Sequence, residues 1–589
     1  MTMWWQDPFR MFQTNLREID AGLDIEAVLD YLEDFGADTW LLSVGGILSN
    51  YPTDLDFQTR NPYLSERPSG DLVGDAVEAA ARRGIRVLGR MDFSKIDHRR
   101  AEAHPDWCFV GPTGERQVYN GLTSVCPSGE YYQVKLFEVL DEVLDRYPLA
   151  GFFCNWMSFN EVDYSRVYHG VCHCVGCRQR YDGTLPDDPD AGWRAFTKHV
   201  LDDLTGRIRE HLEGRAALVL GDRADIVFHE ANNAVGRRLW HHRTSENVSA
   251  AKTYRPEVPV LTNSVAFVDM PYRLAGEDPR HFAQYLVQAI ARGANPSTYI
   301  MGTPATTPYA CLEIAGQLTR FHRDHADVYR DLVPAARTLL VRGESRAEFE
   351  GLYLALLQRH VPFDVLPAER LPDVDLGRYQ VVVLPDLGPV DLGEYDGKVV
   401  ATGVTELNPI ASYETEAATR GLHLEGGVPV IGAFHVVEAA GELQAYSRAP
   451  YGPPEKCHGH ELLPHPGMVR QGNKVLFPWT IGRAYREVGL TVHRDLFVDQ
   501  VGEGLATELP EQVEVVVGRS AAGYVVHLLN RSGDTDQRFA PPLPIGPGRL
   551  RVPDGVQEVH ALNAGERLPV DDGWVHVPEI GLFEVLVCA

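Results

Sequence analysis

Three closely spaced cysteines are the first residues of this chain that could do chemistry. Cys172, Cys174 and Cys177 form a C-x-C-x-x-C pattern in the segment YHGVCHCVGC. Thiolates at this spacing can converge on one metal ion, and Cys126 in TSVCPSGEYY is the candidate fourth ligand. Four thiolates leave zinc no open position for water, so the pattern predicts a structural zinc site. The alternatives are reduced cysteines without a metal and, less favoured, a redox motif.

Three carboxylates stand where a reaction could take place. Glu230 in VFHEANN ends an apolar run, Glu246 lies in TSENVS, and Asp269 lies in VDMPYR. Cleavage of a glycosidic bond needs one carboxylate that attacks or activates water and one carboxylic acid that protonates the leaving oxygen. Two of these residues facing each other across a pocket would meet that need.

Each acid also has a structural interpretation. Glu246, with Ser245 as the cap, could be a charge at the N-terminus of a helix. Glu230 could form a buried salt bridge to Arg243 or another arginine, and Asp269 could pair with Arg273 on a solvated loop rim. The sequence leaves these alternatives open.

Aromatic, amide and imidazole side chains accompany the three acids. Aromatic rings suit the apolar face of a sugar, and amide or imidazole groups suit its hydroxyls. We expect the following residues to line a sugar pocket: Asn155, Trp156, Tyr164, His169, His229, Asn263 and Tyr272.

Repeated βα units must position these side chains. Short β-branched or aromatic runs alternate with amphipathic helical stretches up to about residue 335. Eight such units predict a TIM (β/α)₈ barrel over residues 1–335, with its reactive groups at the C-terminal ends of the strands. The expected strands are 10–18, 39–46, 85–93, 149–156, 224–231, 237–243, 258–265 and 297–303.

Two further domains are expected after the barrel. Continuous apolar runs such as YQVVVLPDL alternate with helices over residues 336–432, which predicts a small flavodoxin- or amidotransferase-like parallel α/β domain. Alternating segments such as VEVVVGRSAAGYVVHLLNRSG predict a C-terminal antiparallel β-sandwich over residues 433–589, with an irregular, loop-rich insertion. The chain is therefore expected to be an α/β protein with three domains.

Composition excludes several classes of partner. Acidic residues outnumber basic ones by 82 to 55, for a net charge of −27, and no basic stripe is present, so nucleic acid is not expected. No apolar run approaches the ~20 residues that cross a bilayer, so no membrane partner is expected. The start of the sequence lacks the features of a signal peptide, and nine cysteines is an odd number, so a reducing, cytoplasmic location is expected.

The order of these motifs resembles a family of glycosidases. The segments GFFCNWMS, YHGVCHCVGC, FHEANN, TSENV, VPVLTNSVAFVDMPYR and YQVVVLPDL run through nearly the whole chain. In this order they are similar to glycoside hydrolase family 151, the α-L-fucosidases with a barrel, a β-galactosidase trimerisation-like domain and a C-terminal β-domain. The cysteines resemble the zinc cluster of the family 42 β-galactosidases, in which a Cys-Pro segment, here Cys126-Pro127, supplies the fourth ligand.

Two catalytic patterns do not carry over. The family 42 enzymes end the fourth strand in Asn-Glu, where this chain has Asn155-Trp156. Family 29 fucosidases place a nucleophilic Asp in a strand resembling GFFCN, where this chain has Asn155. The second domain resembles class I glutamine amidotransferases without their cysteine, which implies an assembly domain and a homo-oligomer, a trimer or a multiple of one.

These observations predict a retaining exo-glycosidase, α-L-fucosidase-like, that acts on a small carbohydrate substrate and uses no organic cofactor. Glu230 and Glu246 are the predicted catalytic pair, with Asp269 as the substitute for either. The alternatives are a glycosidase for another sugar, such as a galactoside or arabinoside, and a catalytically silent sugar-binding protein. The role of the Pro-rich loop from Arg448 to Glu461 stays open between an interface and a pocket wall.

Overall fold

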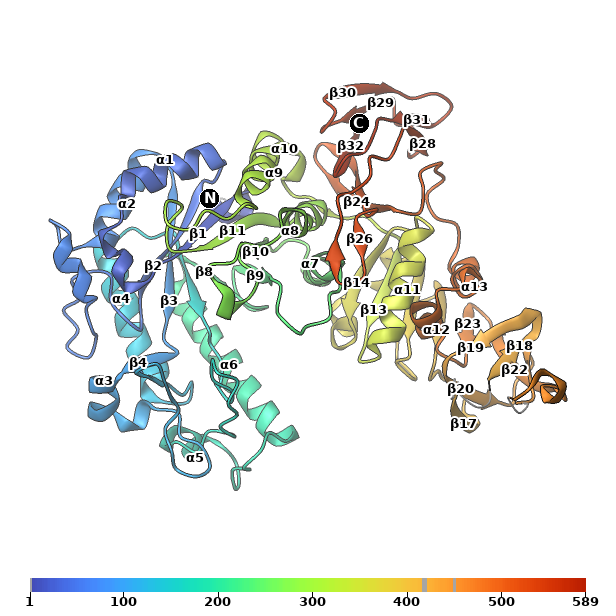
Figure 1. Ribbon diagram of the computed structural model, residues 1–589, viewed down its shortest axis with the longest axis horizontal. Coiled ribbons are helices and arrows are strands. Elements are labelled where there is room, and N and C mark those ends of the chain that lie inside the picture. The colour runs from blue at the N-terminus through green and yellow to red at the C-terminus, as the bar shows by residue number, and fades with distance from the viewer. Residues whose placement is uncertain (1–2, 416–420, 449–451) are drawn as a thin grey trace. The chain divides into compact units, whose positions relative to one another are not determined.

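The protein forms two compact units that interleave along the sequence. The structure is a computed structural model, and it describes residues 3–415, 421–448 and 452–589. The first unit comprises residues up to 239 together with 258–290 and 294–326. The second comprises 240–257, 291–293 and 327–589. Figure 1 follows the chain from its blue N-terminus to its red C-terminus.

The first unit is built on a closed barrel of parallel strands (Figure 1), which confirms the predicted TIM-barrel class. Every neighbouring pair in it runs parallel. The strands in barrel order are β1 (Met11–Asn15), β11 (Asn295–Met301), β10 (Val260–Val265), β9 (Ile226–Ala231), β8 (Ala217–Leu220), β7 (Gly151–Asn155), β3 (Arg86–Asp92) and β2 (Thr39–Gly45).

The first helix shows how local sequence sets these elements. In α1 (Ile25–Phe35) the carboxylate of Asp24 accepts a hydrogen bond from the Ala27 N–H at 3.1 Å and caps the N-terminus. Gly36 ends the helix with φ of 90°, a left-handed conformation that glycine adopts at low cost. Apolar residues at helical spacing are buried, so one face of α1 packs on the barrel.

Further helices and a small sheet follow the other strands of this unit. The helices are α2 (Leu72–Arg82), α3 (His98–Ala103), α4 (Leu136–Arg146), α5 (Val175–Arg180), α6 (Ala191–Leu212), α8 (Pro279–Ala291) and α9 (Leu312–Asp324). The short helix α10 (Ala326–Tyr329) comes next in the chain, and its residues from Asp327 on belong to the second unit. The sheet is antiparallel and consists of β4 (Lys95–Asp97), β6 (Leu122–Ser124) and β5 (Val118–Tyr119). It extends the connection after β3, so Lys95 is held close to the end of a barrel strand.

One predicted barrel strand is wrong. Residues 237–243 form loop and the first residue of α7 (Arg243–Tyr254), and the sixth strand in chain order is β9 instead. The missed strand is β8, which residues 221–225 join to β9 without a helix. The run ALVL of β8 is short and lies close before the next strand, so the sequence pattern did not mark it as a strand of its own.

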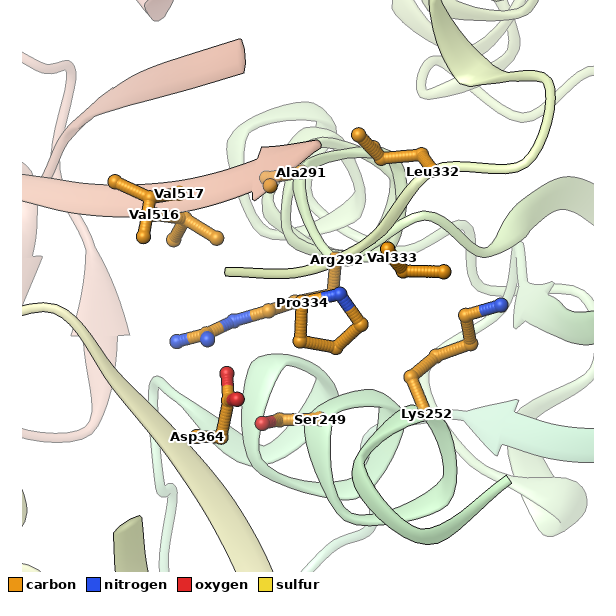
Figure 2. A pocket seen from close by; sticks show the side chains of 11 residues that line it. Ser249, Lys252, Ala291, Arg292, Leu332, Val333, Pro334, Asp364, Val516 and Val517 are labelled. Atoms are coloured by element: carbon orange, nitrogen blue, oxygen red, sulfur yellow. The ribbon is translucent and has the colours of Figure 1, made fainter. Parts of the chain in front are cut away.

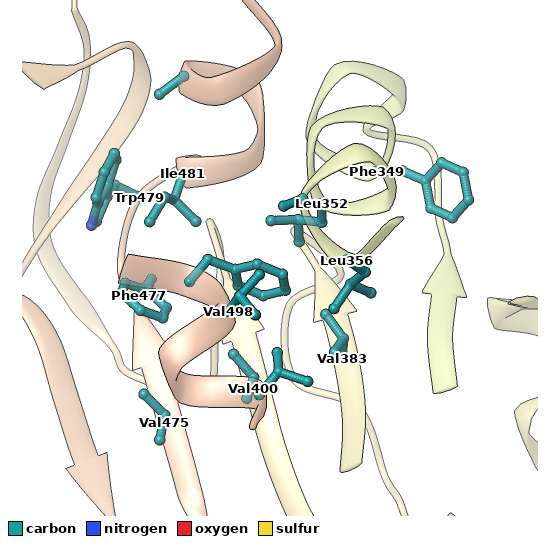
Figure 3. Close-up of a cluster of buried hydrophobic side chains, with 14 of the residues drawn as sticks. Phe349, Leu352, Leu356, Val383, Val400, Val475, Phe477, Trp479, Ile481 and Val498 are labelled. Carbon is teal, nitrogen blue, oxygen red and sulfur yellow. The ribbon is translucent and has the colours of Figure 1, made fainter. Parts of the chain in front are cut away.

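The second unit contains a mixed sheet whose core is apolar. The sheet order is β14 (Phe363–Pro367), β13 (Thr338–Arg342), β15 (Val381–Pro385), β16 (Lys398–Thr402), β23 (Lys474–Phe477), β22 (Leu462–Gln471), β21 (Glu442–Tyr446), β18 (Leu422–Leu424) and β19 (Val428–Val430). Helices α11 (Arg346–Gln358), α12 (Ile481–Val488) and α13 (Thr491–Val501) contribute to the cluster, in which Leu352 and Leu356 face Val383, Val400 and Val498 (Figure 3).

Two glycines let α11 and α12 approach closely. A Cβ atom on Gly351 would lie 1.8 Å from the carbonyl oxygen of Gly482. Since no side chain fits that gap, the two helices pack backbone against backbone.

The parallel part of this sheet extends beyond the predicted domain boundary at 432. Strand β23 pairs parallel with β16, with Val400 opposite Val475. The span that the sequence marked as irregular therefore supplies a strand of the α/β sheet and two helices that pack with it. Strands β17 (Pro409–Thr415) and β20 (Gly432–Val437) form a separate antiparallel pair.

Antiparallel sheets complete the second unit, as the predicted fold class requires. The main sheet has the order β12 (Val333–Pro334), β24 (Val513–Ser520), β25 (Gly523–Asn530), β32 (Phe583–Cys588), β29 (Glu558–Ala561) and β30 (Glu566–Pro569). Two antiparallel pairs accompany it, β28 (Gly548–Arg551) with β31 (Trp574–Val577) and β26 (Asp534–Thr535) with β27 (Arg538–Phe539). In the described chain, no helix combines the length and apolar character that a membrane span requires.

Candidate active site

A large cavity of about 910 Å³ opens at the C-terminal ends of the barrel strands. Its volume lies in the range of sites that hold a small-molecule ligand. Strand ends and the loops that follow them supply its wall, which includes Gln13, Asn15, Arg90, Lys95, Asn155, Trp156, Asp163, Tyr164, Arg166, Glu230, Asn263, Asp269, Arg273 and Tyr299. In barrel enzymes this face carries the reacting groups.

A second cavity, in the second unit, is too small to be a substrate site. It measures about 10 Å³ and lies among Ser249, Lys252, Arg292, Asp364 and Pro334 (Figure 2). A space of that size holds about one water molecule.

Glu230 reaches the cavity from β9. Side chains alternate along a strand, so Phe228 and Glu230 both point to the pocket side. The Nδ2 amide of Asn232 donates a hydrogen bond to Glu230 Oε1 at 2.8 Å. Burial raises the pKa of Glu230, and the Asn232 bond and the nearby Arg237 and Arg90 offset only part of that rise. A carboxyl group in this state is suited to hold a proton and donate it.

Asp269 is the second carboxylate of the cavity. It lies after β10, where its Oδ2 accepts a hydrogen bond from the Val235 N–H at 2.8 Å and its Oδ1 accepts one from the Met270 N–H at 2.7 Å. The alternative partner, Arg273, makes no ion pair within the described residues. The structure therefore brings Glu230 and Asp269 together in one pocket without neutralising Asp269.

Asp163 is a third carboxylate of the wall, and it holds a loop. Its Oδ1 accepts hydrogen bonds from the N–H and the hydroxyl of Ser165 at 2.8 and 2.6 Å. Its Oδ2 lies 2.9 Å from Nε2 of His169. These bonds lower the pKa of Asp163, so it stays ionised. The prediction that His169 lines the sugar pocket is not supported, because its imidazole orients Asp163 and is absent from the wall of the cavity.

The aromatic part of the predicted wall is in place. Trp156 and Tyr164 meet edge to face with ring centroids 4.6 Å apart. Trp156 adopts φ of 50°, a left-handed conformation that costs free energy in a bulky residue and often marks a functional site. The Lys95 ammonium lies 5.2 Å from the Trp156 centroid and 5.1 Å from that of Tyr164, within cation–π range.

The two predicted asparagines also reach the cavity, and both have protein partners. Asn155 donates a hydrogen bond from Nδ2 to Asp92 Oδ2 at 2.7 Å. Asn263 donates to Gln13 Oε1 at 2.6 Å and accepts from the Ser297 hydroxyl at 2.8 Å. These bonds fix the orientation of both amides in the wall.

Two other predicted sugar ligands do not line the cavity. His229 precedes Glu230 in β9, so strand alternation turns its side chain to the opposite face. Tyr272 is 52% exposed on the loop between Pro271 and Arg273, which do line the cavity. In both cases a neighbour in the sequence lines the cavity in place of the predicted residue.

Glu246 has a structural role in the second unit, so the predicted pairing with Glu230 is not supported. Its carboxylate is 3% exposed and accepts hydrogen bonds from Arg342 at 2.8 Å, from Arg346 at 2.7 Å and from the Trp240 Nε1–H at 2.8 Å. Burial alone would raise the pKa of Glu246, but the two guanidinium groups lower it below its ordinary value. Glu246 lies in the first turn of α7, as its structural interpretation expected, but the residue at the N-cap is His242 and not Ser245.

Sequence reasoning missed the cations of the cavity. Arg90, Lys95, Arg166 and Arg273 line it, as does Tyr299. A signal was present for Arg90, since a charged residue inside the apolar barrel strand IRVLGRMDF needs a reason to be there. Lys95 and Arg166 lie in loops whose path the sequence does not specify.

The four predicted zinc ligands converge. The sulfur atoms of Cys126, Cys172, Cys174 and Cys177 all lie within 4.8 Å of one another and are buried. Tetrahedral zinc with four thiolates would place its sulfurs roughly 3.8 Å apart. The N–H groups of Ser128 and Cys177 donate to sulfurs of the cluster at 3.4 Å each, as they would to thiolates.

The surroundings of the four cysteines also fit a structural metal. Phe109, Val171 and Trp193 shield the cluster from solvent. A Cβ on Gly176 would lie 2.3 Å from the Ser128 carbonyl oxygen, so α5 and the Cys126 loop approach as closely as shared ligation requires. The residues thus fit a Cys₄ site, and the zinc itself stays a prediction.

Comparisons with known proteins agree with this geometry. The family model described as "Hypothetical glycosyl hydrolase 6" matches residues 24–156, which contain β2, β3 and β7. Over these residues the chain resembles that glycosyl hydrolase family. No curated protein matches the sequence.

Solved structures share its fold over the full length. The α-L-fucosidase isoenzyme 2 of Paenibacillus thiaminolyticus is 16% identical, covers 99% of each chain and has a TM-score of 0.77. The β-galactosidase of Bacillus circulans sp. alkalophilus is 13% identical, covers 99% of each chain and has a TM-score of 0.68. The β-galactosidase of Halorubrum lacusprofundi is 14% identical, covers 99% of this chain and 98% of its own, and has a TM-score of 0.65. At these identities the similarity establishes the fold.

Proposed function

We propose that the protein is a retaining exo-glycosidase whose catalytic pair is Glu230 and Asp269. The observation that carries this proposal is the presence of both carboxylates in one cavity, one partly buried with a raised pKa and the other held by backbone N–H groups. Glycoside hydrolysis uses one protonated and one ionised carboxyl group in this way.

The roles follow from the two environments. Glu230 donates its proton to the glycosidic oxygen as the bond from that oxygen to the anomeric carbon breaks. Asp269 attacks the anomeric carbon from the other side and forms a glycosyl ester. Glu230, now ionised, then takes a proton from water, which displaces Asp269 and releases the sugar. This assignment requires the two carboxyl groups to act about 5 Å apart, whereas inversion would need about 6.5–9.5 Å.

An α-L-fucoside is the sugar that we propose first. The α-L-fucosidase of P. thiaminolyticus has the same architecture along its full length, and the motif order resembles family 151. A galactoside comes second, since β-galactosidases share the architecture as well. The predicted structural zinc at the Cys₄ cluster and the predicted homo-oligomer belong to this proposal.

A panel of aryl glycosides tests the proposal. We expect turnover of the aryl α-L-fucoside, and we expect Glu230→Gln to lower kcat by roughly 10²–10⁴-fold because it removes the proton donor. Glu115→Gln is the matched control, since Glu115 is exposed and lies outside the cavity wall. Sugar binding in calorimetry without turnover of any glycoside would favour the silent sugar-binding protein instead.

A further inference from the structure

We infer that the pocket recognises a glycoside that carries an anionic group, a sulfate ester or a carboxylate, and that Arg273, Lys95 and Arg90 are the residues that bind it. This inference deepens the proposed function, on which it rests for the glycoside part of the ligand. It starts from the charges of the cavity wall.

Basic residues outnumber acidic ones in the cavity wall, whereas acidic residues outnumber basic ones in the whole chain. Four cations line it, against the three carboxylates Asp163, Glu230 and Asp269. The whole chain has 55 basic and 82 acidic residues. Burial raises the pKa of Glu230, so one of the three acids is less ionised than an ordinary glutamate. A positive pocket in an acidic protein attracts anions selectively.

Arg273 is a cation of the wall whose buried Nε has no protein partner among the described residues. Within the described residues its guanidinium makes no ion pair and no hydrogen bond. A buried donor without an acceptor costs free energy, and a ligand oxygen would remove that cost.

Lys95 is a buried ammonium group without a carboxylate in contact. The residue is 4% exposed, and its Nζ donates to the hydroxyl of Ser124 at 3.3 Å. Its other neighbours in the cavity are the rings of Trp156 and Tyr164. Burial lowers the pKa of Lys95, and Asp92 and Asp163 act on it through space to raise it in part. Burying an unpaired charge costs free energy. An anionic ligand that contacts the Lys95 ammonium would offset that cost.

Arg90 keeps part of its guanidinium available. Its Nη2 lies 3.2 Å from Asp92 Oδ2, while its buried Nε has no partner among the described residues. Arg90 and Arg273 act on the same two phenols, because both lower the pKa of Tyr299 and Tyr164 against the rise that burial causes. The two guanidinium groups therefore gather around one part of the wall.

The simpler explanation is that the cations serve the catalytic acids. In that case they would pair with Glu230 or Asp269. No ion pair within 4.0 Å joins Arg273, Lys95 or Arg90 to either acid in the described chain. Guanidinium groups match the paired oxygens of sulfate and carboxylate, and the resulting charge-assisted bonds are the strong ones.

Calorimetric titration with three sugars tests the inference. The probes are methyl α-L-fucoside, the same fucoside carrying one sulfate ester, and methyl α-galacturonide. We expect at least one anionic probe to bind about 10-fold or more tightly than the neutral fucoside, since a hydrogen bond to a charged group contributes about that much. The two anionic arms distinguish sulfate from carboxylate.

Variants assign the effect to the named cations. Arg273→Gln should remove most of the anionic preference, measured in the variant itself as the ratio of the Kd values of the neutral and the anionic probe. Lys95→Met is the second variant, with its fold checked by circular dichroism. Arg238→Gln is the matched control, since Arg238 is exposed and lies outside the cavity wall; it should keep the preference.

The outcomes separate the inference from the proposed function. Turnover of neutral fucoside with no preference for either anionic probe overturns the inference and leaves the function standing. Preferential binding of an anionic probe with no turnover of any glycoside overturns the function and supports the inference. An anionic preference that survives both Arg273→Gln and Lys95→Met overturns the assignment to these residues.

Discussion

Asp269 and Val235 tie two barrel loops together, since the Val235 N–H donates to Asp269 Oδ2 at 2.8 Å. Val235 follows the strand that carries Glu230, so this bond couples the positions of the two proposed catalytic carboxylates. The bond also restricts rotation of the Asp269 carboxylate. No ion pair to Asp269 is found among the described residues, so the carboxylate is not blocked by a cation and can act as a nucleophile.

The pH profile should report the raised pKa of Glu230. As a proton donor, Glu230 is active only while protonated, so kcat/KM should fall as pH rises through its raised pKa. The basic limb should therefore lie above the ordinary range of a glutamic acid. Measurement with an aryl glycoside across pH 4–9 checks this, and a limb that is unchanged in Glu230→Gln would assign it to another group.

Asp269→Asn should separate charge from hydrogen bonding. Asparagine keeps an oxygen that can accept from Val235 and a similar shape, so the loops should stay in place. It lacks the negative charge that attacks the anomeric carbon, so kcat should fall by roughly 10³-fold or more. Steady-state kinetics measure the fall in kcat, and a melting curve checks that the loops stay in place. Full activity of Asp269→Asn would remove Asp269 from the mechanism.

Glu246→Gln should weaken the second unit and leave catalytic chemistry alone. The change leaves Arg342 and Arg346 without their shared carboxylate. Both arginines are partly exposed, so we expect a loss of about 1–3 kcal/mol in the free energy of unfolding. Urea denaturation checks the loss, and kcat for the folded variant should stay near that of the parent.

The same ion pair predicts the direction of an acid effect. The folded-state pKa of Glu246 is depressed, so its stabilisation is fully present above the pKa of the unfolded state and is lost as pH falls through the folded pKa. Glu246→Gln should therefore lose less stability than the parent between neutral and strongly acidic pH. An identical acid response in the two proteins would mean that this pair contributes little.

The sequence was sufficient to predict the fold class and several of the segments that line the cavity. It was insufficient to predict which side chains of those segments point into the cavity. Apolar periodicity locates the barrel because most of its strands are continuous buried runs, as in β2. It fails at β8, where two strands follow each other without a helix. Among the site residues, Glu230 was identified together with His229, although strand alternation allows only one of them to face the pocket.

Other side-chain positions could not be predicted because they depend on partners that are far away in the sequence. Glu246 appeared catalytic because its partners, Arg342 and Arg346, come about a hundred residues later and no local pattern connects them. Lys95 depends on a small antiparallel sheet that pairs it with Ser124. Cys126 could be predicted because Cys126-Pro127 resembles the segment that supplies the fourth zinc ligand in the family 42 β-galactosidases.

The cysteine cluster should hold one zinc ion per chain, and its loss should destabilise the first unit. Binding of a structural ion to four thiolates contributes free energy only in the folded state, so Cys172→Ser should lower both the zinc content and the melting temperature. Cys457→Ser is the matched control, because Cys457 is exposed and lies outside the cluster. Metal analysis of the purified chain and melting with and without a strong chelator provide the measurements. Equal melting curves for the parent with and without chelator, together with no bound metal, would leave four reduced thiols as the correct interpretation.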